Sequence, residues 1–208
     1  MSTPPRRRRI VKQIFVIGGM GSGKSTASKA LVEKGLALID LDKVGHDILK
    51  WEIVKDDLRV AFGDDIFDEN GEVVRPKLAE KAFSAPAETR KLNRITMPRI
   101  EESYTDQIDE LKKQGVDAVV VEYSVFKNRD NSLAYDADAV IAVLAPIEAR
   151  IERAVASGWD EEDVQRRIAQ QITDADRAEA ADVVFNNVGT KEELRDSVLA
   201  WWDEYNKQ

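Results

Sequence analysis

The sequence predicts an α/β fold in which a parallel sheet is flanked by helices. Five short segments are rich in apolar and β-branched residues, as buried strands are, and helical patterns separate them. These segments lie at residues 10–17, 36–40, 116–123, 137–146 and 182–187. Strands that alternate with helices pair in parallel, because each crossover returns the chain to the same end of the sheet.

The first and last helices have clear sequence signals. A helix is expected to follow the first strand and its loop, to run through about Glu33 and to end near Gly35, a C-cap residue. Thr190 and Glu193 form the pattern of a capping box that opens the final helix. The helical spacing of its large apolar residues favours core packing over a base-stacking platform. Those residues are Leu194, Val198, Trp201, Trp202 and Tyr205.

Two longer helical segments, 43–114 and 147–178, interrupt the strand pattern and are expected to be a substrate lobe and a lid. Within the first of them, turn chemistry is expected at Asn70-Gly71. Helix boundaries are expected at Pro76, Pro86 and Pro98. The predicted organisation is a disordered basic tail (1–9) and one domain (10–208), with core segments 10–42, 115–146 and 179–208, a lobe at 43–114 and a lid at 147–178.

Composition narrows the classes of function. The formal net charge of −8 over 208 residues disfavours non-specific nucleic-acid binding, which depends on neutralising phosphates with Lys and Arg. The chain has no cysteine and one histidine, His46, so disulfides and Cys- or His-built metal sites are not expected. No membrane span and no signal peptide are expected, and the cytoplasm is the predicted location. The run Arg6–Arg9 is interpreted as part of the solvated tail.

The segment Gly18-Gly-Met-Gly-Ser-Gly-Lys24-Ser25 matches the phosphate-loop pattern G-x-x-x-x-G-K-[ST], between a predicted strand and a predicted helix. Glycines let the backbone curl so that successive N–H groups face phosphate oxygens, and the helix dipole adds positive potential. Lys24 is expected to reach the β- and γ-phosphates, and the Ser25 hydroxyl to bind Mg²⁺. A glycine-rich turn without a ligand is the alternative, but such a turn does not need Lys and Ser after Gly.

Two aspartates, Asp40 and Asp42, follow the second predicted strand, at the sheet edge where ligands bind in open parallel sheets. One of them could accept a proton from an acceptor hydroxyl, and the other could hold Mg²⁺ through water. Helix capping by Asp42 is a competing interpretation.

The remaining motifs favour a small-molecule kinase over other nucleotide-binding proteins. No guanine-reading N-K-x-D pattern follows a later strand, and the chain is short for a motor ATPase, although Val119-Val-Val-Glu122 partly fits one. The segment 147–178 is rich in arginine, as is typical of a lid that neutralises a transferring phosphoryl group. Its arginines are Arg150, Arg153, Arg166, Arg167 and Arg177. A salt-bridged surface helix pair is the alternative for this segment.

Ordered segments over about residues 14–190 resemble the dephospho-CoA kinase family. They are 17–26 (IGGMGSGKST), 38–49 (LIDLDKVGHDIL), 62–83, 90–100, 161–171 and 181–189. The sequence departs from the family pattern at Glu122–Lys127, where P-L-L-F-E is expected, at Met97 in place of His, and at Ala156–Gly158, where a lid arginine is expected.

The resemblance implies a P-loop kinase fold and ATP-dependent phosphorylation of the ribose 3′-hydroxyl of dephospho-CoA, with Mg²⁺. It implies Asp42 as general base and substrate-binding residue, Arg75 as a second substrate-binding residue, Lys24 as a catalytic residue, and Ser25 and Asp40 as Mg²⁺ ligands. The implied ATP-binding residues are Gly19, Gly21, Ser22, Gly23, Lys24, Ser25, Thr26, Arg153 and Asn187. A monomer or small homo-oligomer is expected. A kinase of another nucleotide, nucleoside or metabolite, or a non-catalytic nucleotide-binding regulator, stays open as an alternative.

Overall fold

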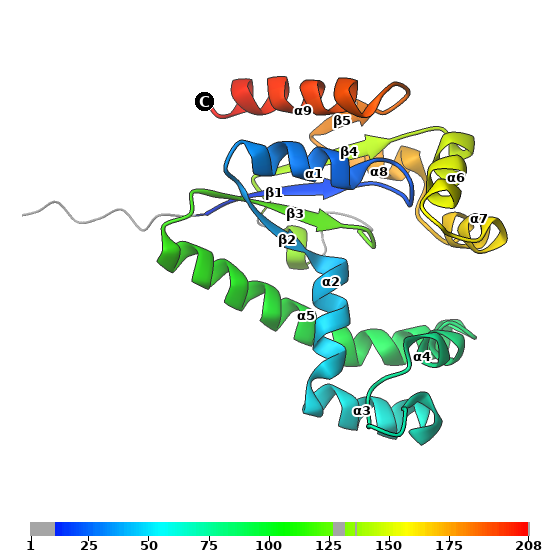
Figure 1. Cartoon of the computed structure of the whole chain (residues 1–208). Helices are drawn as coiled ribbons and strands as arrows, with labels where there is room; N and C mark the ends of the chain where they lie inside the picture. Colours follow the sequence, from blue (N-terminus) through cyan, green and yellow to red (C-terminus); the bar gives the residue numbers. More distant parts are fainter. Residues whose placement is uncertain (1–10, 127–131, 136, 208) are drawn as a thin grey trace, which may run out of the picture. The chain divides into compact units, whose positions relative to one another are not determined.

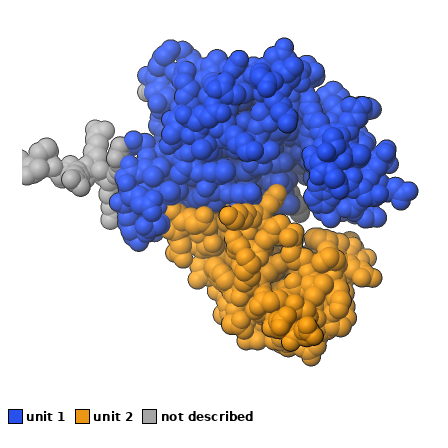
Figure 2. All heavy atoms as spheres, in the orientation of Figure 1, with its two compact units in different colours: residues 1–40, 108–208 blue, residues 41–107 orange. Residues whose placement is uncertain are grey.

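The computed structural model describes residues 11–126, 132–135 and 137–207. The predicted tail at 1–9 lies outside these residues. Lys127, the last residue of the segment Glu122–Lys127 that departs from the family pattern, also lies outside them. By its internal contacts the chain divides into two compact units, coloured in Figure 2. The first unit comprises residues 1–40 and 108–208, and the second comprises residues 41–107.

The first unit is built on a parallel sheet in the order β2-β3-β1-β4-β5, in which every neighbouring pair is parallel (Figure 1). The strands are β1 (Lys12–Ile17), β2 (Ala37–Asp40), β3 (Ala118–Tyr123), β4 (Ala139–Leu144) and β5 (Val183–Asn186). Each strand lies within the segment predicted for it, so the predicted parallel sheet is confirmed. β4 and the second part of β1, from Ile14 to Ile17, are apolar and almost wholly buried, as strands covered on both faces are.

Helices α1 (Lys24–Glu33) and α9 (Lys191–Tyr205) cover the same face of this sheet (Figure 1). Their buried residues, including Leu31, Val198 and Trp202, form one core cluster with β1, β3 and β4. The predicted capping box at the start of α9 is present, and Trp201 and Tyr205 stack with ring centroids 4.9 Å apart. The expectation that the α9 aromatics serve core packing is therefore confirmed.

The charged segment of the first unit forms three short helices, α6 (Ile147–Ala156), α7 (Glu161–Ala169) and α8 (Asp174–Ala180). Asp160 caps α7 by accepting a hydrogen bond from the Asp163 amide. A reciprocal capping box between Thr173 and Asp176 starts α8. The N-cap side chains Asp160 and Thr173 therefore fix where α7 and α8 begin.

The second unit is helical. It contains α2 (Leu41–Asp47), α3 (Glu52–Phe62), α4 (Arg75–Ala82) and most of α5 (Pro86–Gln114), with short 3₁₀ turns at Ile48–Lys50 and Asp64–Ile66. A third 3₁₀ turn, Ser132–Ala134, lies in the first unit. Leu58, Ile66 and Val54 are fully buried and provide apolar packing within the second unit.

The predicted turn at Asn70-Gly71 is present in the second unit. Gly71 has a φ of +76°, a conformation that glycine adopts without strain. One carboxylate oxygen of Asp68 accepts hydrogen bonds from the amides of Asn70 (2.9 Å) and Glu72 (2.8 Å). The flanking residues Phe67 and Val73 form an antiparallel bridge.

The prediction that Pro98 marks a helix boundary is wrong. Pro76 and Pro86 do lie at the starts of α4 and α5, where a missing N–H costs nothing, but Pro98 lies inside the 29-residue α5. An internal proline removes one backbone hydrogen bond and costs roughly 3 kcal/mol. The many other backbone bonds of this long helix offset that local loss.

Among the described residues, no helix is both long enough and apolar enough to cross a membrane.

Candidate phosphate-binding site

The predicted phosphate loop connects β1 to α1 at the carboxyl end of the central strand. Gly21 and Gly23 have φ values of +73° and +107°, which residues with a Cβ rarely adopt. Gly23 is the N-cap of α1 and has no side chain to cap the first turn. The start of α1 therefore offers backbone N–H groups and the positive end of its dipole to an anion.

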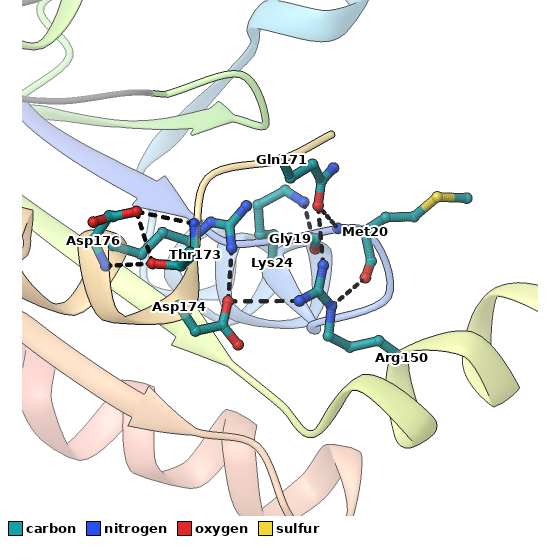
Figure 3. Close-up of polar contacts among 9 residues, drawn as sticks. Gly19, Met20, Lys24, Arg150, Gln171, Thr173, Asp174 and Asp176 are labelled. Atoms are coloured by element: carbon teal, nitrogen blue, oxygen red, sulfur yellow. Dashed lines mark hydrogen bonds and ion pairs between the residues drawn. The ribbon is translucent and has the colours of Figure 1, made fainter. Parts of the chain in front are cut away.

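Lys24 lies over the inner side of this loop. Its ammonium donates to the carbonyl oxygen of Gly19 at 3.2 Å (Figure 3). The same oxygen accepts from the Ser22 amide at 3.2 Å. Lys24 as a whole is largely buried, with 9% of the residue's surface exposed. A cation held in this position by the loop backbone is preorganised for phosphate oxygens.

On the outer side of the loop, both backbone polar groups of Met20 have side-chain partners. Arg150 Nε, from α6, donates to the Met20 carbonyl at 2.8 Å. The Met20 amide donates to Gln171 Oε1 at 3.1 Å, and this oxygen also accepts from Arg150 Nη2 at 3.0 Å (Figure 3). The loop is therefore hydrogen-bonded to the segment predicted as the lid.

Two loop glycines lie directly against Arg150. A Cβ at Gly19 would overlap the Arg150 guanidinium, and a Cβ at Gly21 would overlap the Arg150 main-chain carbonyl. Sequence analysis explained these glycines by the curl of the loop alone. The structure adds a second reason at Gly19, whose φ is not positive: the space that a side chain needs is already occupied.

Asn187, which directly follows β5, and Arg153 of α6 are both predicted to bind ATP, and they form a chain of hydrogen bonds to the loop. Asn187 Nδ2 donates to the Ser22 carbonyl at 2.8 Å, and Asn187 is 6% exposed. Arg153 Nη2 donates to the Asn187 carbonyl at 3.2 Å. Among the described side chains, Arg153 Nη1 and Ser22 Oγ are buried polar atoms without a hydrogen-bond partner. An orphaned buried donor of this kind suits a ligand that brings acceptor oxygens.

Asp40, Glu122, Ser25 and Thr26 all lie at the carboxyl edge of the sheet. Asp40 ends β2 and is in register with Glu122 on β3, so the two carboxylates are neighbours on adjacent parallel strands. Ser25 is exposed as the second residue of α1, and Thr26 follows it half-buried. Because the carboxyl ends of parallel strands share one edge, hard oxygen donors gather on the side of the sheet that carries the loop.

The other predicted substrate residues, Asp42 and Arg75, lie in the second unit. Asp42 is exposed in the first turn of α2, as its second residue rather than at the position before the helix that a capping residue takes. Arg75, at the start of α4, donates from Nη2 to Nε2 of His46 at 2.6 Å. His46 follows Asp42 by four residues on α2, so the two side chains share a helix face. Sequence analysis gave His46 no functional role.

The five arginines of the predicted lid fall into different environments. Arg150 and Arg177 are buried, whereas Arg166 and Arg167 are exposed and both pair with Asp163. Hydrogen bonds from these two arginines, chiefly from Arg167, lower the pKa of Asp163. The alternative interpretation, a salt-bridged surface helix, therefore holds for α7 but not for α6 or α8.

The sequence pattern placed Arg150 only among the lid arginines and named Arg153 as the ATP contact. In the structure, Arg150 and Ala154, four residues apart, are the buried positions of α6, which the charged sequence of this segment did not reveal. An arginine on the apolar face of a helix that follows a central strand has to find buried acceptors.

The comparisons with known proteins agree with this geometry. The family model described as dephospho-CoA kinase matches residues 13–193. A protein named dephospho-CoA kinase from Corynebacterium jeikeium is 41% identical over 193 residues, which cover 91% of this chain and 97% of the relative. One from Corynebacterium efficiens is 39% identical over 185 residues, covering 88% and 92%.

A solved structure described as TT1252 from Thermus thermophilus superposes with a TM-score of 0.77 at 25% identity, covering 93% of this chain and 97% of that one. The family match covers the sheet, the phosphate loop and the arginine-rich helices described above. The chain therefore belongs to the dephospho-CoA kinase family and is a kinase of the P-loop fold.

Proposed function

We propose that this protein transfers the γ-phosphoryl group of ATP to the ribose 3′-hydroxyl of dephospho-CoA and so completes coenzyme A. The observation that carries the proposal is the loop at 18–25, in a chain whose family is named for this reaction. Its glycine-lined backbone, its buried Lys24 and the start of α1 have the chemistry that binds a chain of phosphates.

The loop residues Gly19 to Thr26 bind the phosphates of ATP. Lys24 neutralises charge on the β- and γ-phosphates during transfer, which makes it a catalytic residue. The buried, unpartnered Nη1 of Arg153 supports a direct contact of this arginine with ATP. Asn187 acts from behind the loop, because its amide bonds the Ser22 carbonyl.

The nucleoside part of ATP binds beside Asn187. A hollow of about 450 Å³ there is lined by residues 184–189 and by Glu193, Leu194 and Ser197 of α9. Leu194 is also one of the neighbours that a Cβ at Gly23 would contact, so the hollow adjoins the phosphate loop. Its position next to the loop supports a base or ribose subsite.

The residues at the sheet edge fit a magnesium ion. Mg²⁺ prefers oxygen ligands and is usually held by one or two protein groups together with substrate phosphates and water. The Ser25 hydroxyl would bind it directly, and Asp40 would hold it through water. Mg²⁺ supplies charge neutralisation at the phosphate oxygens when it is bound.

On the acceptor side, Asp42 takes the proton from the 3′-hydroxyl, and Arg75 binds a phosphate group of dephospho-CoA. Asp42 is an exposed carboxylate in the first helical turn after β2, and general bases of this kind accept protons within hydrogen-bond reach. Arg75 is exposed and bonded to the His46 imidazole, a contact that a phosphate can replace with a stronger, charge-assisted bond.

The test is a product assay with Mg-ATP and dephospho-CoA, in which mass spectrometry identifies coenzyme A phosphorylated at the 3′ position. Parallel reactions offer nucleosides, nucleotides and other small hydroxyl-bearing metabolites as acceptors. Phosphorylation of one of those in place of dephospho-CoA would identify a different kinase. ATP binding with no acceptor consumed would identify a nucleotide-binding regulator.

Three further expectations belong to the same proposal. We place the protein in the cytoplasm, as a monomer or small homo-oligomer, and without a nucleic-acid partner. The net charge of −8 supports the last point, because it opposes non-specific attraction to phosphate backbones. Light scattering of the purified protein measures the oligomeric state.

A further inference from the structure

Arg150 and Gln171 together hold the peptide groups on both sides of Met20, and we call this pair the Met20 clamp. The clamp is a closed cycle of three hydrogen bonds. Arg150 donates to the Met20 carbonyl and to Gln171 Oε1, and this same oxygen accepts from the Met20 amide (Figure 3). Because both partners also bond each other, neither can rotate away without breaking two of the three bonds.

The clamp is charged and buried. Arg150 is 3% exposed, and burial lowers the pKa of its guanidinium while Asp174 opposes that effect. Asp174 Oδ1 lies 3.5 Å from Arg150 Nη1 and accepts from Arg177 Nη1 at 2.6 Å. The two arginines and one aspartate carry one net positive charge, and Arg177 is also buried. Burying a charged guanidinium costs desolvation free energy, and its hydrogen bonds and the nearby Asp174 offset that cost.

The clamp lies against the phosphate loop itself. The Arg150 guanidinium fills the space that a side chain on Gly19 would need. On the other side of the same stretch, the Gly19 carbonyl accepts from Ser22 and Lys24. The first half of the loop is therefore fixed from outside by the clamp and from inside by Lys24. This arrangement directs the later N–H groups, up to the start of α1, toward the phosphates.

We propose that Arg150 and Gln171 are positioning residues for ATP, which set the shape of the phosphate loop through Met20 and link it to α6 and to the segment between α7 and α8. This inference rests on the proposed ATP site but not on the identity of the acceptor. The guanidinium also adds positive potential behind the phosphates, in a site shielded from water.

The test compares Arg150→Gln, Gln171→Leu and the double variant with Arg166→Gln, a matched control on exposed α7. Calorimetry with Mg²⁺ and a non-hydrolysable ATP analogue measures affinity. Hydrogen exchange reports on the Met20 amide, and thermal melting shows that each variant is folded. The clamp variants should weaken nucleotide binding roughly tenfold or more. They should also speed exchange at Met20 and raise the KM for ATP more than the KM for the acceptor. The control should leave all three unchanged.

The double variant should lose about as much affinity as the worse single variant, because the clamp acts as one unit. A second pair of variants distinguishes a positioning role of Arg150 from a role in packing alone. Gly19→Ala should weaken ATP binding by displacing Arg150, and adding Arg150→Ala should restore part of the affinity by making room. Clamp variants that melt earlier but bind the analogue as the unsubstituted protein does would overturn the proposal, as would Gly19→Ala with normal affinity.

Failure of this inference differs from failure of the proposed function. The binding and exchange measurements need no acceptor, so they remain valid if dephospho-CoA is not phosphorylated. If the unsubstituted protein makes coenzyme A while the clamp variants bind nucleotide normally, the clamp is wrong and the reaction stands.

Discussion

Charged side chains beside the phosphate loop and several charged side chains of the second unit have different kinds of partner. Beside the phosphate loop, Lys24 and Arg150 are buried and donate to backbone carbonyls of Gly19 and Met20. In the second unit, several ion pairs join exposed side chains. Examples are Arg59 with Asp56 and Asp64, and Lys50 with Asp47.

This difference separates two uses of charge. A cation bonded to the main chain fixes the backbone that it contacts, which suits a loop that has to keep its shape. Exposed ion pairs contribute little to folding stability, and their side chains can turn toward a ligand at small cost. We therefore expect substitutions in the first unit to change the geometry of ATP binding, and those in the second to change the handling of the acceptor.

The largest expected effect tests the first half of this comparison. Lys24→Ala removes the buried cation and its contact with Gly19, and should reduce kcat/KM by about 10³-fold or more, since a charge that stabilises the transferring phosphoryl group is lost. Steady-state assays of product formation measure it, with Arg166→Gln as control. Near-normal turnover would mean that the loop does not act through this lysine.

An intermediate effect tests the second half. Asp42→Asn keeps the size of the side chain but removes the base, and should reduce kcat by about 10²-fold while ATP affinity changes little. Calorimetry with the ATP analogue and single-turnover assays measure the two quantities separately. An equal loss in both would assign Asp42 a structural role in α2 and remove it from the mechanism.

The smallest expected effect concerns Asp68. This exposed carboxylate of the second unit accepts hydrogen bonds from the backbone, unlike the exposed ion pairs described above. Asp68 accepts from the amides of Glu72 and Asn70, and these bonds lower its pKa. A lowered pKa stabilises the folded state above the unfolded value, about 3.9, and this stabilisation is lost as the pH falls through the folded value. Asp68→Ala should lower the melting temperature by about 2–4 °C at pH 7.

The melting difference between Asp68→Ala and the unsubstituted protein should shrink as the pH falls below about 4. Glu69→Ala, at the next position of the same turn, is the control and should melt normally. A constant difference across the pH range would mean that the charge of Asp68 does not stabilise the turn. In that case Asp68 would not be an example of a charge in the second unit that stabilises the backbone.

The sheet could be predicted from sequence because its strands are mostly apolar runs and because βα alternation leaves few topologies. The phosphate loop could be predicted because its chemistry is local: eight consecutive residues carry the glycines, the lysine and the serine. The capping box at Thr190 and Glu193 was predictable for the same reason. In the loop and the capping box the residues that interact are close in the chain, and in the sheet each strand is marked by its own local pattern, although its partner strand is distant.

The clamp could not be predicted, because its partners are far apart. Arg150 and Met20 are separated by 130 positions, and Gln171 and Met20 by 151. A charge-rich segment does not reveal which arginine is buried until packing is known, so Arg150 and Arg167 look alike in sequence. The predicted helix boundary at Pro98 was wrong for a related reason. The low helix propensity of one proline is outweighed by the other interactions of the 29-residue α5.

The close fit between Gly19 and the Arg150 guanidinium has a consequence for protein engineering. A designer who grafts the eight loop residues onto another sheet transfers the consensus but leaves the outer surface of the loop unsupported. The transferable module is discontinuous: it needs the loop, one arginine from a following helix and one glutamine beyond it. Conversely, swapping α6 between relatives should succeed only when the donor helix leaves the space beside Gly19 occupied by a group of the same shape and hydrogen-bonding pattern.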